Sequence, residues 1–98
     1  MRRQRARRVQ RCISHKPEFT YFKPAGIPKN QLEQIELLAD EYEAMRLSDL
    51  GNLSMQKGAE QMWVSAATFN RMVQSAHRKV ADAIVNGKSI QVFITKDN

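Results

Sequence analysis

The 98-residue sequence predicts a mainly α-helical fold with a helix-turn-helix, a small two-stranded β element and a disordered basic N-terminal arm. Apolar residues recur at steps of three and four between Phe69 and Ile84, which is typical of an amphipathic helix. Two short runs are β-prone, and arginine dominates the first eleven positions. We expect a flexible arm at 1–16 and a single helix-turn-helix domain at 17–98.

The arm has the sequence MRRQRARRVQRCISHK, with few apolar side chains. Such a segment buries too little apolar surface to offset the entropy of ordering it. Its arginines could enter a minor groove of DNA or follow phosphates, and the alternative is a solubilising tail. The arginines of the arm are Arg2, Arg3, Arg5, Arg7, Arg8 and Arg11.

The β element is predicted from two distant runs. The aromatic run 19–22 precedes a connection rich in proline and glycine, and the run 89–95 begins with alternating polar and apolar residues. We expect these runs to pair, within one subunit or between two. Because an isolated two-stranded ribbon is barely stable, this sheet should pack on the helices or be completed across a dimer.

Residues 30–38 are ambiguous. Leu32, Ile35 and Leu38 follow one another at three-residue spacing, which is compatible with a helical turn.

The first predicted helix spans about Asp40 to Leu50. Acids cluster at its start, where the helix dipole favours negative charge, and Gly51 follows its end. Leu38, Tyr42 and Met45 would share one face.

The helix-turn-helix is predicted at about 54–84. Ser54 can cap a helix at 55–62, a three-residue break follows at 63–65, and Ser65 can cap the next helix. A DNA-binding unit of this kind places its second helix in the major groove while the first crosses the backbone.

Small and apolar side chains would hold these two helices together. Ala59 permits close approach, Val64 plugs the turn, and Phe69 and Val73 face inward. The opposite face of the last helix is then polar. It is either a nucleic-acid contact or the solvated face of an amphipathic helix.

Arginine can hold guanine through two hydrogen bonds, and asparagine or glutamine can hold adenine. Hydroxyl and cationic side chains suit phosphates, where contact fixes the register without reading sequence. The expected base-reading residues are Ala66, Ala67, Asn70, Arg71 and Gln74. The expected phosphate-binding residues are Ser54, Lys57, Ser65, Thr68, Ser75, Arg78 and Lys79.

Charge is segregated along the chain, whose net charge is +6. Residues 1–29 hold nine Lys or Arg and one acid, residues 30–53 hold one Arg and six acids, and residues 54–88 hold five Lys or Arg and two acids. Two basic segments that flank an acidic one indicate a protein whose basic parts face a polyanion.

Metal and catalytic functions are disfavoured. Cys12 is the only cysteine, which excludes an internal disulfide and fits a reducing compartment. His77 lies far from Cys12 and His15 in sequence, so we expect no metal site. Ser54 and Ser65 look like helix caps rather than nucleophiles. We therefore expect neither an enzyme nor a cofactor.

A cytoplasmic location without a membrane partner is expected. No apolar stretch approaches the roughly 20 residues of a membrane-spanning helix. The charged N-terminus also lacks the apolar run that follows in a secretory signal.

The segment 53–69 resembles the promoter-reading C-terminal domain of bacterial sigma factors, known as region four. The blocks YFKPAGIP at 21–28 and DEYEAMRLSDL at 40–50, with 75–76, 78–83 and 87–88, are similar to an uncharacterised family of small prokaryotic "predicted DNA-binding" proteins. This second resemblance covers about residues 7–92. It implies a sigma-like helix-turn-helix of the winged-helix-like superfamily and a transcriptional role, without a defined target or ligand.

The chain departs from that family at the predicted site. Trp63 stands where the turn usually has glycine, so either a bulky residue adopts the turn or the turn shifts. Ala66 and Ala67 replace arginine and proline, and His77 replaces another arginine. Lys57 replaces an acid that would complete a capping box with Ser54.

These observations predict sequence-specific binding of double-stranded DNA by a transcriptional regulator. The alternative is an adaptor that uses the same fold against a protein such as RNA polymerase, which the acidic segment 33–49 and the alanines at 66 and 67 favour. RNA is a third candidate, although its deep, narrow major groove suits a helix less well. A homodimer stays open, because a small chain buries little surface alone.

Overall fold

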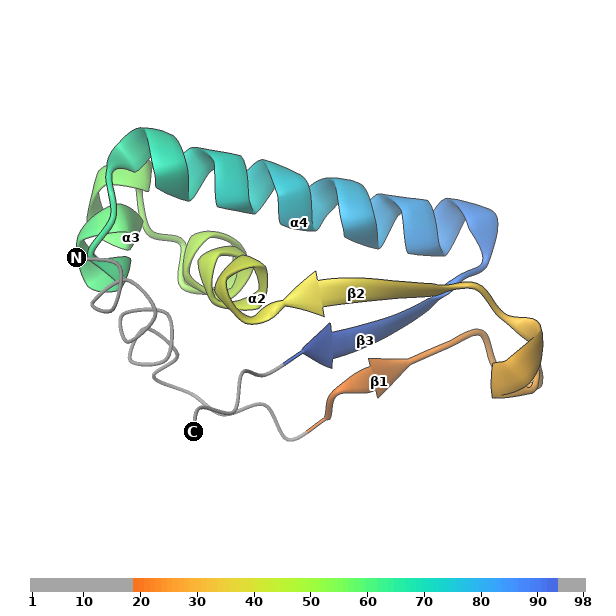
Figure 1. Cartoon of the computed structure of the whole chain (residues 1–98). Coiled ribbons are helices and arrows are strands. Elements are labelled where there is room, and N and C mark those ends of the chain that lie inside the picture. Colours follow the sequence, from red (N-terminus) through yellow and green to blue (C-terminus); the bar gives the residue numbers. More distant parts are fainter. Residues whose placement is uncertain (1–18, 94–98) are drawn as a thin grey trace.

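Helices make up most of the structure, a computed structural model that describes residues 19–93. The mainly helical prediction is confirmed. The principal elements are β1 (Tyr21–Phe22), β2 (Gln34–Leu38), α2 (Ala39–Met45), α3 (Met55–Met62), α4 (Ala66–Asn86) and β3 (Ser89–Phe93) (Figure 1). A 3-10 helix, η1 (Lys29–Gln31), precedes β2, and a π-helical turn, η2 (Arg46–Leu50), continues α2. No helix in this part of the chain is long and apolar enough to cross a membrane.

Helix α4 extends along the molecule from α3 at one end to the sheet at the other (Figure 1). Its N-terminal half packs on α3, and its C-terminal half lies beside the sheet. Ser65 caps its start, and Gly87 ends it in a left-handed conformation with φ 63°. The predicted boundaries of α3 and α4 are confirmed.

A first hydrophobic cluster joins α2, η2, α3 and α4. Phe69 is fully buried and Val73 nearly so, which confirms that both face inward. Val64, in the turn, packs against this cluster from its edge, as predicted. The buried members are Ala44, Leu47, Ala59, Met62, Phe69 and Val73.

Gly58 allows the closest approach of α3 to α4. A Cβ atom at this position would lie 2.3 Å from Cζ of Phe69, closer than real carbon contacts allow. Because the Phe69 ring is fully buried, it has little room to retreat. Gly58 therefore sets the spacing of α3 and α4 together with Ala59, whose small side chain is the one that the sequence predicts to permit close approach.

The sheet has three strands in the order β1-β3-β2, so the prediction of a two-stranded element is wrong. Strand β3 is central and pairs antiparallel with β1, which confirms the predicted partnership within one chain. The sequence left residues 30–38 ambiguous, with a spacing compatible with a helical turn. The structure has a strand there instead, because Gln34–Leu38 pairs parallel with β3.

The burial of β2 explains this correction. Ile35 is paired with Ile90, and Leu37 with Val92, so their side chains share the face that packs on the helices. Leu38, which the three-residue spacing grouped with Ile35, is 41% exposed. The two-residue period of a strand therefore outweighs the helical spacing.

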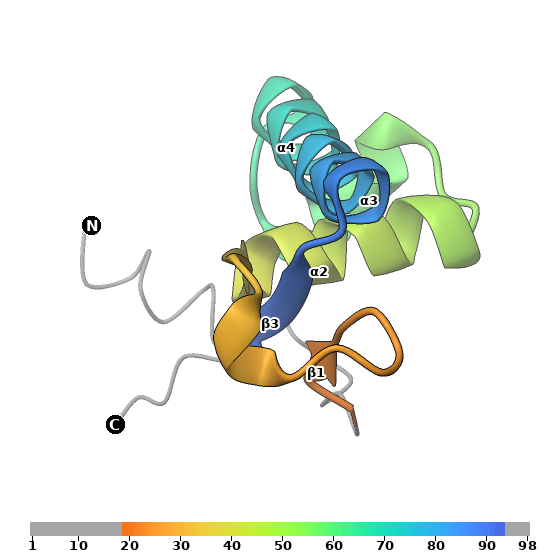
Figure 2. The ribbon, with the colours of Figure 1, turned by 90° about the vertical axis from the view of Figure 1, so that its right-hand side faces the viewer.

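Helix α2 and η2 lie crosswise beneath α4, as Figure 2 shows in a view down α4. The prediction of a helix from 40 to 50 is confirmed in extent, but its last five residues form a π-helix. Leu47 points from this turn into the first cluster.

Substitution of Gly58 by alanine tests the close approach of α3 to α4. We expect Gly58→Ala to lower the free energy of unfolding by about 1–3 kcal/mol, because overpacking against Phe69 outweighs the helix propensity that alanine gains. Chemical denaturation followed by circular dichroism measures this change. Gln61→Ala, on the exposed side of α3, should change stability by less than about 0.5 kcal/mol. A Gly58→Ala protein as stable as the parent would contradict the packing described.

Candidate nucleic-acid interface

The turn between α3 and α4 is built by Trp63, Val64 and Ser65. Trp63 is left-handed, with φ 60° and ψ 42°, so the bulky residue adopts the turn that glycine usually makes. Its N–H donates to the carbonyl of Glu60 over 3.2 Å, and that of Val64 donates to Ala59 over 3.0 Å. These bonds close α3 and fix the angle at which α4 begins. The indole is 71% exposed.

Both predicted caps are present. The Oγ atom of Ser54 accepts from the N–H of Lys57 over 3.1 Å, which starts α3 without the acid of a capping box. The Oγ atom of Ser65 accepts from the N–H of Thr68 over 3.1 Å and donates to the Thr68 hydroxyl over 3.0 Å. In the free protein, these hydroxyls therefore accept hydrogen bonds from N–H groups in the first turns of α3 and α4.

Thr68 connects the cap of α4 to a predicted base-reading residue. Its Oγ1 atom accepts a hydrogen bond from Nη2 of Arg71 over 3.3 Å. The chain from Ser65 through Thr68 to Arg71 holds the guanidinium near the start of α4. A polar side chain held in this way loses less conformational freedom when it binds.

One side of α4 forms a polar surface that no other element covers. We call it the polar face of α4. The hollow along it has a volume of about 340 Å³ and is lined by Asn70, Arg71, Gln74, Ser75 and Arg78. All members of the polar face are exposed: Ala66, Ala67, Asn70, Arg71, Gln74 and Arg78.

Ser75 and Lys79, two predicted phosphate-binding residues, have internal partners instead. The Ser75 hydroxyl donates to Oε2 of Glu41, and the Lys79 ammonium donates to Oε1 of Glu41 over 2.8 Å. Lys79 also donates to the carbonyl of Glu36 over 2.8 Å. Both side chains thus tie α4 to α2 and β2. Of the predicted phosphate-binding cations, Lys57 and Arg78 are the exposed ones.

Glu41 is the acceptor at the centre of this cluster, and its side chain is only 8% exposed. Burial by itself raises its pKa. Hydrogen bonds from Lys79, Ser75 and the backbone N–H of Leu38 outweigh burial and hold the pKa of Glu41 below its usual value. The neighbouring Asp40 behaves oppositely, because burial and the Glu41 charge raise its pKa.

A side-chain hydrogen bond holds the other flank of α4. Nε2 of His77 lies 2.7 Å from Oδ2 of Asp49 in η2. His77 and Ser75 point to opposite sides of α4. Side chains of α2 and η2 therefore hydrogen-bond to α4 on both flanks. His77 therefore meets an acid of the same chain.

Two acids that the sequence pattern presents only as residues favouring a helix start are buried and paired. Glu43 is 1% exposed, and its carboxylate accepts from Nε and Nη2 of Arg46 over 3.0 and 2.7 Å. The three-residue spacing of Glu43 and Arg46 could have indicated this pair. Glu41 likewise stands three residues after Leu38, whose N–H donates to its Oε1 over 2.9 Å.

The arginine arm and two possible metal ligands lie outside the described residues. Arg2, Arg3, Arg5, Arg7, Arg8 and Arg11 of the arm stay a prediction from sequence, as do the roles expected of Cys12 and His15. Within residues 19–93, no group of three or more histidine, cysteine or acidic side chains is arranged to hold a metal ion.

Nearly the whole chain matches a family model. The model described as "Protein of unknown function DUF134" matches residues 1–96. This match agrees with the resemblance to an uncharacterised prokaryotic family. No solved structure matches the chain.

Related proteins carry the name UPF0251 protein. One from Caldanaerobacter subterraneus subsp. tengcongensis is 49% identical over 82 residues, which cover 84% of this chain and 70% of that protein. One from Prosthecochloris aestuarii is 47% identical over 94 residues, covering 94% of this chain and 61% of that protein. One from Methanococcus vannielii is 42% identical over 85 residues, covering 87% of this chain and 65% of that protein. Each relative is longer than its aligned part.

Acid titration tests the role of Glu41. Because its folded pKa is lowered, Glu41 stabilises the fold above its usual value of 4.5, and this contribution disappears as the pH falls through the folded pKa. We expect Glu41→Gln to lower the free energy of unfolding by about 1–3 kcal/mol at neutral pH. The difference from the parent should shrink on acidification.

Glu60→Gln is the matched control, since it removes the same charge from an exposed position on α3. It should shift stability by less than about 0.5 kcal/mol. Urea denaturation at a series of pH values gives both profiles. A Glu41→Gln protein whose deficit does not depend on pH would refute the assignment of a lowered pKa.

Proposed function

The chain belongs to the family described as protein of unknown function DUF134, and we propose that it binds double-stranded DNA sequence-specifically as a transcriptional regulator. In this proposal, α3 and α4 form a helix-turn-helix similar to region four of sigma factors. Helix α4 enters the major groove with its polar face, and α3 lies against the DNA backbone.

The polar face of α4 is the observation that carries this proposal. Asn70 and Gln74 are exposed and make no hydrogen bond to any other described residue, so their amide groups are available. No acidic side chain lines the hollow along this face. Such side chains on an accessible helix can pair with base edges, each good two-bond pair giving about 1–3 kcal/mol of discrimination.

Phosphate contacts would come from around this face. Lys57 in the first turn of α3 and Arg78 on α4 are exposed cations, and Ser54 and Ser65 mark the two helix starts, whose free N–H groups favour anions. The arm would add contacts through its arginines. Ser75 and Lys79 are left out of the proposed interface, because they bind Glu41.

An adaptor role is the second candidate, and one surface favours it. Leu50, at the end of η2, is 85% exposed beside a hollow of about 350 Å³ lined by Tyr42, Met45, Arg46, Asp49 and Leu50. A protein such as RNA polymerase could bind there. However, the acids Glu41 and Glu43 are buried in internal ion pairs, which leaves less negative charge for a partner.

Selection of bound sequences from random duplex DNA, followed by fluorescence anisotropy, tests the proposal. Arg71→Ala should weaken binding to the selected site about tenfold to a hundredfold and relax the preference at one base pair. Arg78→Gln should weaken binding to all sequences alike and reduce the slope of log affinity against log salt by about one.

Lys29→Gln is the charge-matched control, because Lys29 is an exposed residue of η1 and this turn lies at the opposite end of the molecule from α3 (Figure 1). It should leave the salt slope unchanged. Deletion of residues 1–11 should flatten the slope if the arm touches phosphates, whereas an unchanged slope assigns it a solubilising role. No salt-sensitive binding of the parent protein at micromolar concentration would overturn the proposed function.

A further inference from the structure

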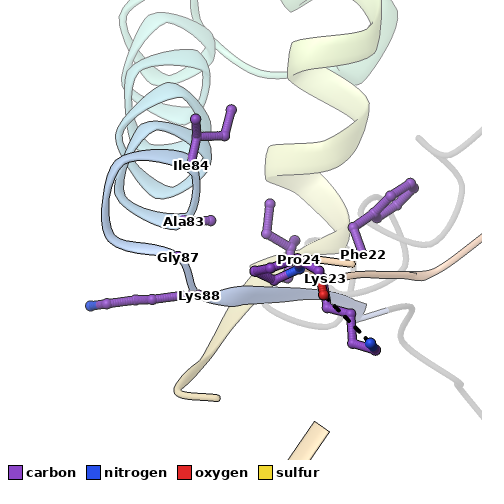
Figure 3. A pocket seen from close by; sticks show the side chains of 8 residues that line it. Phe22, Lys23, Pro24, Ala83, Ile84, Gly87 and Lys88 are labelled. Atoms are coloured by element: carbon purple, nitrogen blue, oxygen red, sulfur yellow. Dashed lines mark hydrogen bonds between the residues drawn. The ribbon is translucent and has the colours of Figure 1, made fainter. Parts of the chain in front are cut away.

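Helix α4 borders two hollows of different chemistry. The hollow beside its C-terminal end has a volume of about 410 Å³ and is lined in part by the apolar side chains of Phe22, Pro24 and Ile84 (Figure 3). The hollow along the polar face is lined mainly by amide and guanidinium side chains. Groups that can hydrogen-bond to base edges are therefore gathered at the second hollow, and Arg71 differs from the amides beside it.

Arg71 has a hydrogen-bond partner in its own helix. Its Nη2 atom donates to Oγ1 of Thr68 over 3.3 Å, and the Ser65 hydroxyl donates to the same oxygen over 3.0 Å. The Oγ atom of Ser65 in turn accepts from the backbone N–H of Thr68, the bond that caps α4. Oγ1 of Thr68 therefore accepts from both sides and ties the Arg71 guanidinium to the first turn of the helix.

The bond to Thr68 leaves most of the Arg71 guanidinium available to a ligand. A guanidinium has five N–H donors, and a two-bond pair with the O6 and N7 atoms of guanine uses two of them. One donor is given to Thr68, so four remain. Among the described residues, no acid lines the hollow that Arg71 borders, so no carboxylate there competes for these donors.

The amides of Asn70 and Gln74 have no such restraint. Both are exposed, without a hydrogen bond to another described residue, and each can rotate to present its carbonyl or its NH₂ group. A free amide must therefore be ordered on binding and can fit more than one base edge. A guanidinium that is already held loses less conformational entropy and meets fewer arrangements of acceptors. Arg71 should therefore be more selective than the amides.

We propose that Thr68 is a positioning residue for base recognition, which holds the Arg71 guanidinium so that the protein prefers one guanine in its DNA site. This step rests on the proposed function. It also changes the role of Thr68, which the sequence predicts to bind phosphate. A phosphate contact strengthens binding to every sequence alike, whereas a positioning contact acts only where Arg71 reads a base.

Thr68→Val tests the positioning role, because valine has the shape of threonine without its hydroxyl. The N–H group that Ser65 caps is unchanged, so the protein should stay folded by circular dichroism. Fluorescence anisotropy of the full chain gives the affinities for the selected site and for the same duplex with the guanine that Arg71→Ala identifies replaced by adenine. Thr68→Val should reduce the ratio of these two affinities about threefold to tenfold, which corresponds to the cost of ordering one long side chain. The salt slope and the affinity for the replaced duplex should not change.

Thr68→Ser is the matched control, since it keeps the hydroxyl and should keep the ratio. In a protein that already carries Arg71→Ala, Thr68→Val should have no further effect on the ratio. Three results would overturn the positioning role: a parental ratio in Thr68→Val, an equal weakening on both duplexes, or a selected site in which Arg71→Ala relaxes no guanine.

The mobility of Arg71 in the free protein gives a second test, which needs no DNA. The order parameter of its Nε–H bond, from nitrogen relaxation, should be higher in the parent and in Thr68→Ser than in Thr68→Val. Equal values in the parent and Thr68→Val would refute the positioning of Arg71 even if the protein binds DNA. A parent protein with a restrained Arg71 that binds no DNA would instead refute the proposed function, and the role of Thr68 in base recognition with it.

Discussion

The crossing of α4 over α2 is the contact on which the rest of the structure depends. Ala44 of α2 and Ala76 of α4 are fully buried, and such small side chains let helices lie close together. On one flank, Glu41 accepts hydrogen bonds from Ser75 and Lys79. On the other, Asp49 pairs with His77. The same crossing separates the first hydrophobic cluster from a second one, formed by Leu37, Ala76 and Val92 between the helices and the sheet, so α4 contributes to both.

This arrangement gives the polar face of α4 a fixed direction. Backbone groups at the turn and the two serine caps set where α4 begins, and the crossing sets its rotation about its own axis. The α4 side chains that point toward α2 are therefore unavailable to a ligand. The solvent-exposed side of α4 carries Asn70, Arg71, Gln74 and Arg78. Among these side chains Arg71 is also held by the Thr68 hydroxyl, so it loses less entropy on binding.

Local signals in the sequence were enough to predict α3, α4 and the β1–β3 pairing. Ser54, Ser65 and Gly87 bound the two helices, and apolar spacing identified Phe69 and Val73 as inward. Strand β2 was not predicted, because its parallel partner is more than fifty residues away and its five residues also fit a helical spacing. The roles of Ser75 and Lys79 were missed for a related reason. Their partner, Glu41, is 34 and 38 residues distant, and no local pattern joins them.

We propose that the polar face of α4, fixed by its crossing over α2, is the surface that meets DNA. Titration of the isotope-labelled protein with a selected duplex, followed by backbone amide chemical shifts, tests this proposal. We expect the largest shifts at residues 54–57 and 65–78, with small ones at η1. Shifts centred on η2 and Leu50, or spread evenly over the sheet, would contradict it.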